Sequence, residues 1–457
     1  MPSSQPHLSP LRHEVRTTFV LALPLIFGHV STGLIGFVDS VLAGRHSANT
    51  LASVAVGSAL WSVAIMVLIG VLLALPPTVS QLDGAGRRGE IAATFRQAVW
   101  LALGLALALF VFLSLAGWML PAMGIAPEIQ PGARAFLDGI RWGVPALALY
   151  FCMRYLSEGL HWTWPTMVFG IGGLALLVPL GYALMFGAFG LPELGAAGLG
   201  YGTAIMLWTQ ALGFGWYLWR SARFADLGLF ARFDPPQWRA IRELLTLGLP
   251  IGVSIFMEGS LFIVTALLIG GMGAVPVAAH QIALNVASVT FMAALGLAEA
   301  TTVRVGYAIG AGRSESVRRA ALAGYLIVLG TQGLAAIAMA LGNTAIASIY
   351  THDAAVVALA ANLLLYAAAF QISDGIQVVS GAALRGLKDT LVPMLLTAFA
   401  YWGIGMSVGV GLGFGLGWGP QGMWCGLIAG LTVAAGLLAW RFVRLTRSPL
   451  VALTQAS

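Results

Sequence analysis

The stretch Gly84-Ala85-Gly86-Arg87 returns unchanged as Gly310-Ala311-Gly312-Arg313, 226 positions later in the chain. Single residues keep the same offset, and the clearest pairs are Pro24 with Pro250, Gly44 with Gly270, Ala52 with Ala278, and Gly70 with Gly296. A repeat of this kind indicates that two halves of about 220 residues share one structural plan. In duplicated membrane bundles, the functional site lies where the two halves face each other.

The composition indicates a membrane protein. The chain is 59% hydrophobic and 9% charged, whereas an ordinary soluble domain has about 25% charged residues. Twelve charge-poor stretches reach the length of about 20 residues that crosses a bilayer, and such segments must be helices, which satisfy their own backbone hydrogen bonds. They lie near 17–40, 52–76, 94–119, 136–157, 163–188, 194–219, 244–270, 279–303, 320–342, 357–382, 391–414 and 421–445. We therefore predict an all-α integral membrane protein with twelve transmembrane helices in two six-helix repeats.

The distribution of polar residues predicts the domain organisation. Residues 221–243 form the only long polar connection, so we interpret them as a cytoplasmic linker between the two halves. The expected parts are a cytoplasmic N-terminal tail (1–16), an N-terminal lobe (17–220), the linker, a C-terminal lobe (244–445) and a cytoplasmic C-terminal tail (446–457).

The basic residues predict the orientation. Of the 23 lysines and arginines, all but Arg45, Arg134 and Arg141 fall at segment ends and loops on one side. Because positive loops stay inside, both termini are expected in the cytoplasm and the protein in the cell inner membrane. This topology explains the basic pI of about 9.6 without a nucleic-acid partner. Anionic lipid headgroups are the expected partners of these side chains.

Three carboxyl groups lie deep in apolar segments: Asp39, Glu258 and Asp374. A charged side chain at the bilayer centre costs at least ~2.5–3.5 kcal/mol, so an acid that is retained there is a functional candidate. The alternative is a structural acid that is hydrogen-bonded to a neighbouring helix. For Glu299, near the inner end of its segment, we favour this structural interpretation.

The surroundings of these acids suggest a coupling ion. No basic residue lies near them in the sequence, so each must be protonated, bound to a metal ion, exposed to water or paired across helices. An acid of this kind can carry H⁺ or Na⁺ and can attract a cationic substrate. Adding the repeat offset to Asp39 leads to Thr265, and subtracting it from Glu258 leads to Thr32. The ion chemistry of the two halves is therefore not equivalent, and we expect the halves to have different tasks.

Several motifs resemble those of the MATE (multidrug and toxic compound extrusion) transporters of the NorM-like branch, over nearly the whole chain. The matching stretches are Gly36-Phe-Val-Asp39-Ser-Val-Leu-Ala-Gly44, Val277-Ala-Ala-His280-Gln281-Ile-Ala, Val303-Arg304-Val-Gly306 with Gly310, Ser373-Asp374-Gly-Ile-Gln377-Val, and Gly381-Ala-Ala-Leu-Arg385-Gly386. The resemblance implies twelve helices in two six-helix lobes around a central cleft. It also implies the export of amphipathic, mostly cationic drugs or dyes in exchange for Na⁺ or H⁺.

The resemblance also implies roles for single residues. Glu258 and Asp374 match the pair that binds the coupling cation, which could be Na⁺, in the C-terminal lobe. Asp39 matches the N-lobe acid that is linked to protonation, and Pro24 matches the bending proline of the same helix. Phe370 matches a possible aromatic residue of the cation or substrate site. The chain departs from the family pattern there, because relatives carry a tyrosine, so the ring is kept and the hydroxyl is lost.

A second departure affects the N-terminal lobe. The two asparagines that relatives place in helix 5 are here Leu177 and Gly181. Asp39 thus lacks two expected carboxamide partners.

Other patterns carry weaker implications. A wall rich in Met and Phe could accommodate varied drugs, and its expected residues are Phe256, Met257, Phe291 and Met292. The GxxxG spacing of Gly248 and Gly252 is typical of a close helix crossing. We interpret the alternating glycines of 409–419 as a loose, closely packed helix end. For His29 and His280 we favour packing or interhelical hydrogen bonding over metal binding.

Alternative functions fit the sequence less well. A flippase for lipid-linked sugars would share twelve helices, but its cleft would be expected to hold several arginines for pyrophosphate. An intramembrane enzyme would need a nucleophile with a base, or a metal cluster, and no such spacing occurs. The chain has no GxxxxGK[ST] loop for ATP. We therefore expect a secondary antiporter that is monomeric, needs no cofactor other than its coupling ion, and is not an enzyme.

Overall fold

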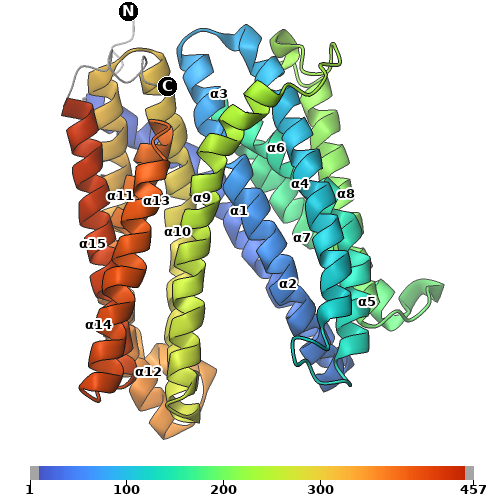
Figure 1. Cartoon of the computed structure of the whole chain (residues 1–457), viewed down its shortest axis with the longest axis vertical. Helices are drawn as coiled ribbons and strands as arrows, with labels where there is room; N and C mark the ends of the chain where they lie inside the picture. The colour runs from blue at the N-terminus through green and yellow to red at the C-terminus, as the bar shows by residue number, and fades with distance from the viewer. Residues whose placement is uncertain (1–9, 448–457) are drawn as a thin grey trace, which may run out of the picture. The chain divides into compact units, whose positions relative to one another are not determined.

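The computed structural model describes residues 10–447, and this part of the chain is almost entirely helical, without a strand (Figure 1). Residues 1–9 of the predicted N-terminal tail and 448–457 of the C-terminal tail lie outside the described residues. The helices of the first half are α1 (Pro10–His46), α2 (Ala48–Leu72), α3 (Leu75–Gly84), α4 (Ile91–Met119), α5 (Gln130–Ile140), α6 (Val144–Gly159), α7 (Trp164–Phe186) and α8 (Ala196–Arg220). Those of the second half are α9 (Trp238–Gly270), α10 (Ala274–Gly310), α11 (Ser314–Tyr350), α12 (Ala354–Gly386), α13 (Leu391–Ala398), α14 (Ser407–Val410) and α15 (Pro420–Arg447).

The helices confirm the predicted fold class. Ten helical stretches among the described residues are long and apolar enough to cross a membrane. The two other predicted segments, 136–157 and 194–219, are also helical, since α5 and α6 cover the first and α8 covers the second. The first of these segments contains the charged residues Asp138, Arg141 and Arg154, which lower its hydropathy. All twelve predicted segments are thus helices.

Contacts between residues divide the chain into two compact units. The N-terminal unit comprises Phe27–Asp83 and Arg87–Gly252, and the C-terminal unit comprises α1 up to Ile26, Gly84–Gly86 and the chain from Val253 onward. The division falls inside α1 and α9, two residues after Pro24 and Pro250. The first part of each of these helices therefore packs with the helices of the other half of the sequence.

Two close contacts reproduce the sequence repeat in space. In the N-terminal unit, a Cβ atom at Gly70 would lie 2.2 Å from Cα of Gly252, and one at Gly248 would lie 2.2 Å from the carbonyl oxygen of Val71. In the C-terminal unit, a Cβ atom at Gly296 would lie 2.7 Å from the backbone nitrogen of Ile26. Gly70 corresponds to Gly296, and Gly252 to Ile26, at the offset of 226. The GxxxG pair of α9 thus permits the close crossing that the sequence predicts.

The polar segment that follows α8 is hydrogen-bonded to α4. Arg96 of α4 donates from Nε to Asp234 at 2.5 Å and from Nη1 to the carbonyl oxygens of Gly228 and Leu229. Trp100 donates from its indole nitrogen to the carbonyl oxygen of Asp234 at 2.9 Å. These bonds hold the segment in one conformation against the N-terminal unit.

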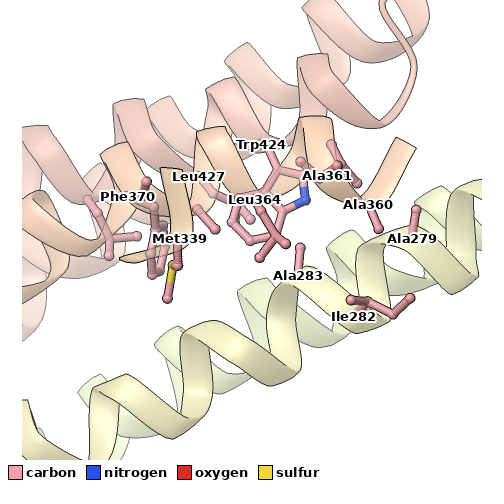
Figure 2. Close-up of a cluster of buried hydrophobic side chains, with 14 of the residues drawn as sticks. Ala279, Ile282, Ala283, Met339, Ala360, Ala361, Leu364, Phe370, Trp424 and Leu427 are labelled. Atoms are coloured by element: carbon pink, nitrogen blue, oxygen red, sulfur yellow. The ribbon is translucent and has the colours of Figure 1, made fainter. Parts of the chain in front are cut away.

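The C-terminal unit is built around α12, which packs against α10, α11 and α15. Its main core combines small residues of α10 and α12, such as Ala283 and Ala360, with larger ones such as Leu364, Trp424 and Leu427 (Figure 2). Because alanines let the helix backbones approach, the large side chains fill the remaining space.

Glycines bring α15 against the preceding helix, which is partly π-helical. The π-helical segments are η5 (Phe399–Met406) and η6 (Gly411–Gly415). A Cβ atom at Gly426 would lie 2.4 Å from Cα of Gly409, and one at Gly422 would lie 2.4 Å from the backbone nitrogen of Gly413. The alternating glycines therefore form a closely packed helix end, as the sequence predicts. The switch to π-helix was not predicted.

Candidate functional site

Two of the three deep acids come together in the C-terminal unit. Glu258 lies on α9, where it is half-buried, and Asp374 lies on α12, where 2% of the residue is exposed. The two carboxyl groups lie within electrostatic reach of each other. Two carboxylates that share a buried site repel each other unless a proton or a cation offsets their charge. This arrangement can therefore hold a monovalent cation or a shared proton.

Tyr401 faces this acid pair from a third helix. It lies in the π-helical segment η5 and is 0% exposed. Its hydroxyl group lies beside Glu258 and interacts electrostatically with both acids, although it makes no well-formed hydrogen bond within the described residues. π-Helical turns often occur at functional sites because they redirect a side chain. Tyr401 thus brings a third oxygen-bearing group to the acid pair.

Amide and hydroxyl groups line α12 next to Asp374. Gln371, one turn earlier, donates from Nε2 to Oγ1 of Thr290 at 2.6 Å, while its buried Oε1 has no hydrogen-bond partner in the described part of the chain. Ser373 shares a hydrogen bond of 2.7 Å with Thr432 of α15. The Gln371 amide is therefore fixed by α10, and its oxygen remains available inside the protein.

A basic residue, Arg385, acts on Glu258. Arg385 lies eleven positions after Asp374 on the same helix, and its positive charge attracts the carboxyl group of Glu258. The sequence analysis found no basic residue near Glu258, because Arg385 is brought close only by the packing of α12 against other helices. The site therefore combines two acids with one nearby arginine.

Phe370, the expected aromatic residue of the cation site, packs in the hydrophobic core. Its ring makes edge contacts with the rings of Phe262 and Trp424, with centroid distances of 6.0 and 5.9 Å, and it is 4% exposed (Figure 2). It lies one turn before Asp374 on the same helix. Phe370 brings no hydroxyl group to this region, whereas Tyr401 places a hydroxyl group beside the acid pair from η5.

Asp39 belongs to the N-terminal unit, whereas Glu258 and Asp374 belong to the C-terminal unit. It is 5% exposed, and its Oδ1 has no hydrogen-bond partner among the described residues. Helix α7 runs beside α1, since Gly170 approaches Gly28 and Gly181 approaches Leu42. The two positions of the missing asparagines therefore lie at the depth of Asp39.

The environment of Asp39 on the side of α7 is apolar. Leu177 is fully buried, and a Cβ atom at Gly181 would lie 3.2 Å from a methyl group of Leu42. Helix α7 thus offers no carboxamide at these two positions, as the sequence indicates.

The residues expected to line a drug cleft lie on α9 and α10 of the C-terminal unit. Met257 packs against the main core of the C-terminal unit, and Phe291 packs against a second core that includes Leu21 and Leu25 of α1. Phe256 is exposed, and Met292 is half-buried.

Pro24 and His280 lie within helices. Pro24 is inside the continuous helix α1. Both ring nitrogens of His280 lack a hydrogen-bond partner among the described residues, and its ring packs on Trp424 at 5.8 Å. For His280, this fits the packing role that we favour.

The sequence analysis missed Tyr401 and Gln371. A signal was present, because a tyrosine or glutamine inside an apolar segment must find a polar partner for its hydroxyl or amide group. The sequence could not show that Tyr401 would face the acid pair or that Gln371 would bind Thr290 of α10.

Comparison with protein families identifies two matching regions. The MatE family model matches residues 24–183 and 250–410, one region in each half of the chain.

Relatives with curated names match nearly the whole chain. A protein of Xanthomonas axonopodis pv. citri (strain 306), named "Probable multidrug resistance protein NorM", is 61% identical over 97% of both chains. "Multidrug resistance protein PmpM" of Pseudomonas aeruginosa is 42% identical, over 96% of this chain and 93% of that protein.

Solved structures share the fold at low sequence identity. The structure described as "Crystal structure of MATE in the bent conformation" has a TM-score of 0.87 at 17% identity and covers 98% of this chain and 99% of that one. The eukaryotic MATE transporter AtDTX14 has a TM-score of 0.86 at 18% identity, over 97% and 100% of the two chains. Together with the two-part family match, these similarities show that the chain belongs to the MatE family and is a NorM-like, multi-pass membrane transporter rather than an enzyme.

Proposed function

We propose that this transporter exports amphipathic, mostly cationic drugs in exchange for H⁺ or Na⁺, by alternating access. The drug substrates are supported by the relatives named multidrug resistance proteins, which match over nearly the whole chain. The same relatives favour drug export over the flipping of lipid-linked sugars.

The observation that carries the ion coupling is the pair Glu258 and Asp374. Helices α9 and α12 hold these two acids within electrostatic reach of each other, with the Tyr401 hydroxyl beside them. Two acids that lie close together in an apolar membrane segment are costly unless they bind a positive charge. If the pair exchanges this positive charge for a cationic drug, the transport cycle explains why two acids lie close together here. A purely structural role would not require such a pair.

The choice of ion follows from the number of oxygens. Na⁺ needs several oxygens to replace its hydration shell, whereas H⁺ needs one carboxylate. Phe370 and the α7 positions of Leu177 and Gly181 offer fewer oxygens than the family pattern implies. We therefore propose H⁺ as a sufficient driver, with Na⁺ binding at the C-terminal site, where Tyr401 restores one oxygen.

The N-terminal unit has a separate role in this proposal. Asp39 is buried in the N-terminal unit, and it lies fifteen positions after Pro24 on the same helix. Because proline removes one backbone hydrogen bond, α1 can bend at Pro24 when Asp39 gains or loses its proton. Met257 and Phe291, with Phe256 and Met292, are proposed to contact the drug during transport.

The proposed setting is the cell inner membrane, with both termini in the cytoplasm. The strong bias of the arginines supports this orientation. The segment 221–243 is then the cytoplasmic linker between the lobes, and the transporter works as a monomer.

Substitution of the acids tests the ion coupling. Glu258→Gln and Asp374→Asn keep the size of each side chain but remove its charge, so each should abolish efflux-based drug resistance at normal membrane expression. Glu243→Gln is the matched control, since Glu243 is an exposed acid on the same helix α9. Full resistance in both site variants would contradict the assignment.

A further inference from the structure

The first part of α1 packs along α10 within the C-terminal unit. Leu25 of α1 shares a buried core with Leu297 of α10. At the next position of each helix, the backbones come close, since a Cβ atom at Gly296 would lie 2.7 Å from the backbone nitrogen of Ile26. Ile26 is also the last residue of α1 that belongs to the C-terminal unit, because the chain from Phe27 onward belongs to the N-terminal unit.

An ion pair joins the same two helices nearer to the start of α1. Glu14, in the second turn of α1, accepts hydrogen bonds of 2.7 Å from both Nε and Nη2 of Arg304 on α10. The side chains of Glu14 and Arg304 are only 11% and 19% exposed. Two parallel bonds fix the orientation of both side chains, which a contact between point charges would not do. The ion pair and Ile26 thus hold a stretch of α1 that is about 18 Å long, at 1.5 Å per residue.

Stability alone does not explain this ion pair. A desolvated ion pair can often be replaced by apolar side chains without a loss of stability, and its best-attested use is to fix the register of packed elements. The repeat-related positions of Glu14 and Arg304 are Ala240 and Thr78, so α9 has no ion pair at the matching place. The pair therefore belongs to one of the two related helices, the helix that carries Asp39.

The ion pair holds the side of α1 that precedes its proline. Pro24 lies ten positions after Glu14 and two before Ile26. Because proline has no backbone N–H group, it cannot donate to the carbonyl group of Val20, and the helix can bend there. A bend moves the side of the helix that is not held. Glu14 and Arg304 hold the side before Pro24.

We propose that Glu14 and Arg304 are positioning residues for proton coupling, because their ion pair keeps the first part of α1 on α10 throughout the transport cycle. The bend at Pro24 then moves only the part of α1 from Phe27 onward, which carries Asp39. Without the ion pair, protonation of Asp39 would shift the whole helix instead of bending it. This inference rests on the role of Asp39 in the proposed function.

Hydrogen–deuterium exchange of the purified full-length protein tests the ion pair without a transport assay. We expect slow amide exchange in residues 14–26 in acidic and in neutral buffer, after correction for the intrinsic effect of pH. Glu14→Gln should accelerate this exchange by about tenfold or more, because removing one partner of a buried ion pair is strongly destabilising. Exchanging the two charges, with Glu14→Arg and Arg304→Glu, should slow it again. Glu315→Gln is the matched control, since it removes an exposed acid that pairs with Arg319 on α11.

Dye efflux from proteoliposomes tests the link to proton coupling. Glu14→Gln should lower efflux on a proton gradient by about fivefold or more, which is the lower end of the usual coupling between two sites. Na⁺ should still release dye from this purified variant, as we expect for Asp39→Asn. The charge-exchange variant should recover its efflux, and Glu315→Gln should transport like the wild type.

A covalent link distinguishes a fixed attachment from a gate that must open. Glu14→Cys with Arg304→Cys, in a chain whose Cys152 and Cys425 are replaced by alanine, would be joined by a short bis-methanethiosulfonate reagent. We expect the link to restore proton-driven efflux, and a reducing agent to remove this recovery. A gate would instead be blocked by the link.

Four results would overturn the inference: exchange in Glu14→Gln no faster than in Glu315→Gln, normal proton-driven efflux in Glu14→Gln, no recovery in the charge-exchange variant, or efflux that the covalent link fails to restore. Circular dichroism would check that each variant keeps its helices. Absence of wild-type efflux on the proton gradient would instead contradict the proposed function, and hydrogen exchange would then still decide whether the ion pair holds α1.

Discussion

At the scale of single residues, Tyr401 is the main residue of the candidate site that only the structure reveals. It lies in a π-helical segment, is fully buried, and places its hydroxyl beside Glu258. Phe370, where the family pattern has a tyrosine, packs against Phe262 and Trp424. Tyr401 can thus supply the oxygen that position 370 lacks.

Tyr401→Phe should weaken Na⁺ binding more than proton-driven transport. A hydrogen bond to a charged group contributes about 1.5–3 kcal/mol, so we expect a loss of Na⁺ affinity of at least about tenfold. The measurement is the Na⁺ concentration at which half of a bound dye is released from the purified protein. Tyr366→Phe is the control, since Tyr366 packs on the same core. Unchanged Na⁺ dependence in Tyr401→Phe would remove Tyr401 from the site.

Asp39 should have an effect distinct from that of the acid pair. Because it lies in the other unit, Asp39→Asn should reduce proton-driven efflux while Na⁺ still releases dye from the purified protein. Glu258→Gln should lose both responses. If Asp39→Asn also abolished the Na⁺ response, the two units would not have the separate tasks that we propose.

At the scale of elements, glycine contacts position the helix that carries Tyr401. Gly405 approaches Gly430, Gly409 approaches Gly426, and both contacts join the α13–α14 region to α15. A side chain at these positions would separate the two helices. The π-helical segment and its tyrosine therefore depend on small residues in a neighbouring helix.

Gly426→Ala should destabilise the protein and impair transport. The added Cβ atom would lie 2.4 Å from Gly409, and such overpacking costs about 1–3 kcal/mol. Gly436→Ala on the same helix is the control, because no atom lies within 4 Å of its added Cβ. Thermal unfolding in detergent would compare the two. If Gly426→Ala had the same midpoint temperature of unfolding as the control, α15 could shift to accept the added Cβ atom without a loss of stability.

At the scale of the whole molecule, the sequence predicts the helices but not the contacts between them. Apolar segments of bilayer length predict twelve helices, because a helix satisfies its own backbone hydrogen bonds where lipid offers no partner. The repeat also matches Gly70 with Gly296, and the structure shows a close helix contact at each of these glycines. It could not predict that the first parts of α1 and α9 pack with the opposite half, since helix packing joins residues that are distant in sequence.

The candidate site shows the same limit. Glu258 and Asp374 were found from their burial in apolar segments, and the family resemblance joined them as a pair. Tyr401 and Arg385 were missed, because their approach to Glu258 depends on how three helices pack. Hydropathy describes the depth of a residue in the membrane, but not which helix it faces.

Antiport requires that the ion and the drug weaken each other's binding by the same factor. One elementary charge that crosses 100 mV supplies about 2.3 kcal/mol, which is enough to drive export against a concentration gradient. The ion that supplies this energy can be identified by imposing each gradient alone.

The most direct test is dye efflux from proteoliposomes with a proton gradient and a Na⁺ gradient imposed separately. We expect efflux on the proton gradient alone, and loss of this efflux in Glu258→Gln and Asp374→Asn but not in Glu243→Gln. Strong transport on a Na⁺ gradient alone, with none on the proton gradient, would contradict the proposal that H⁺ suffices. Transport that responds to neither gradient would contradict cation-coupled antiport itself.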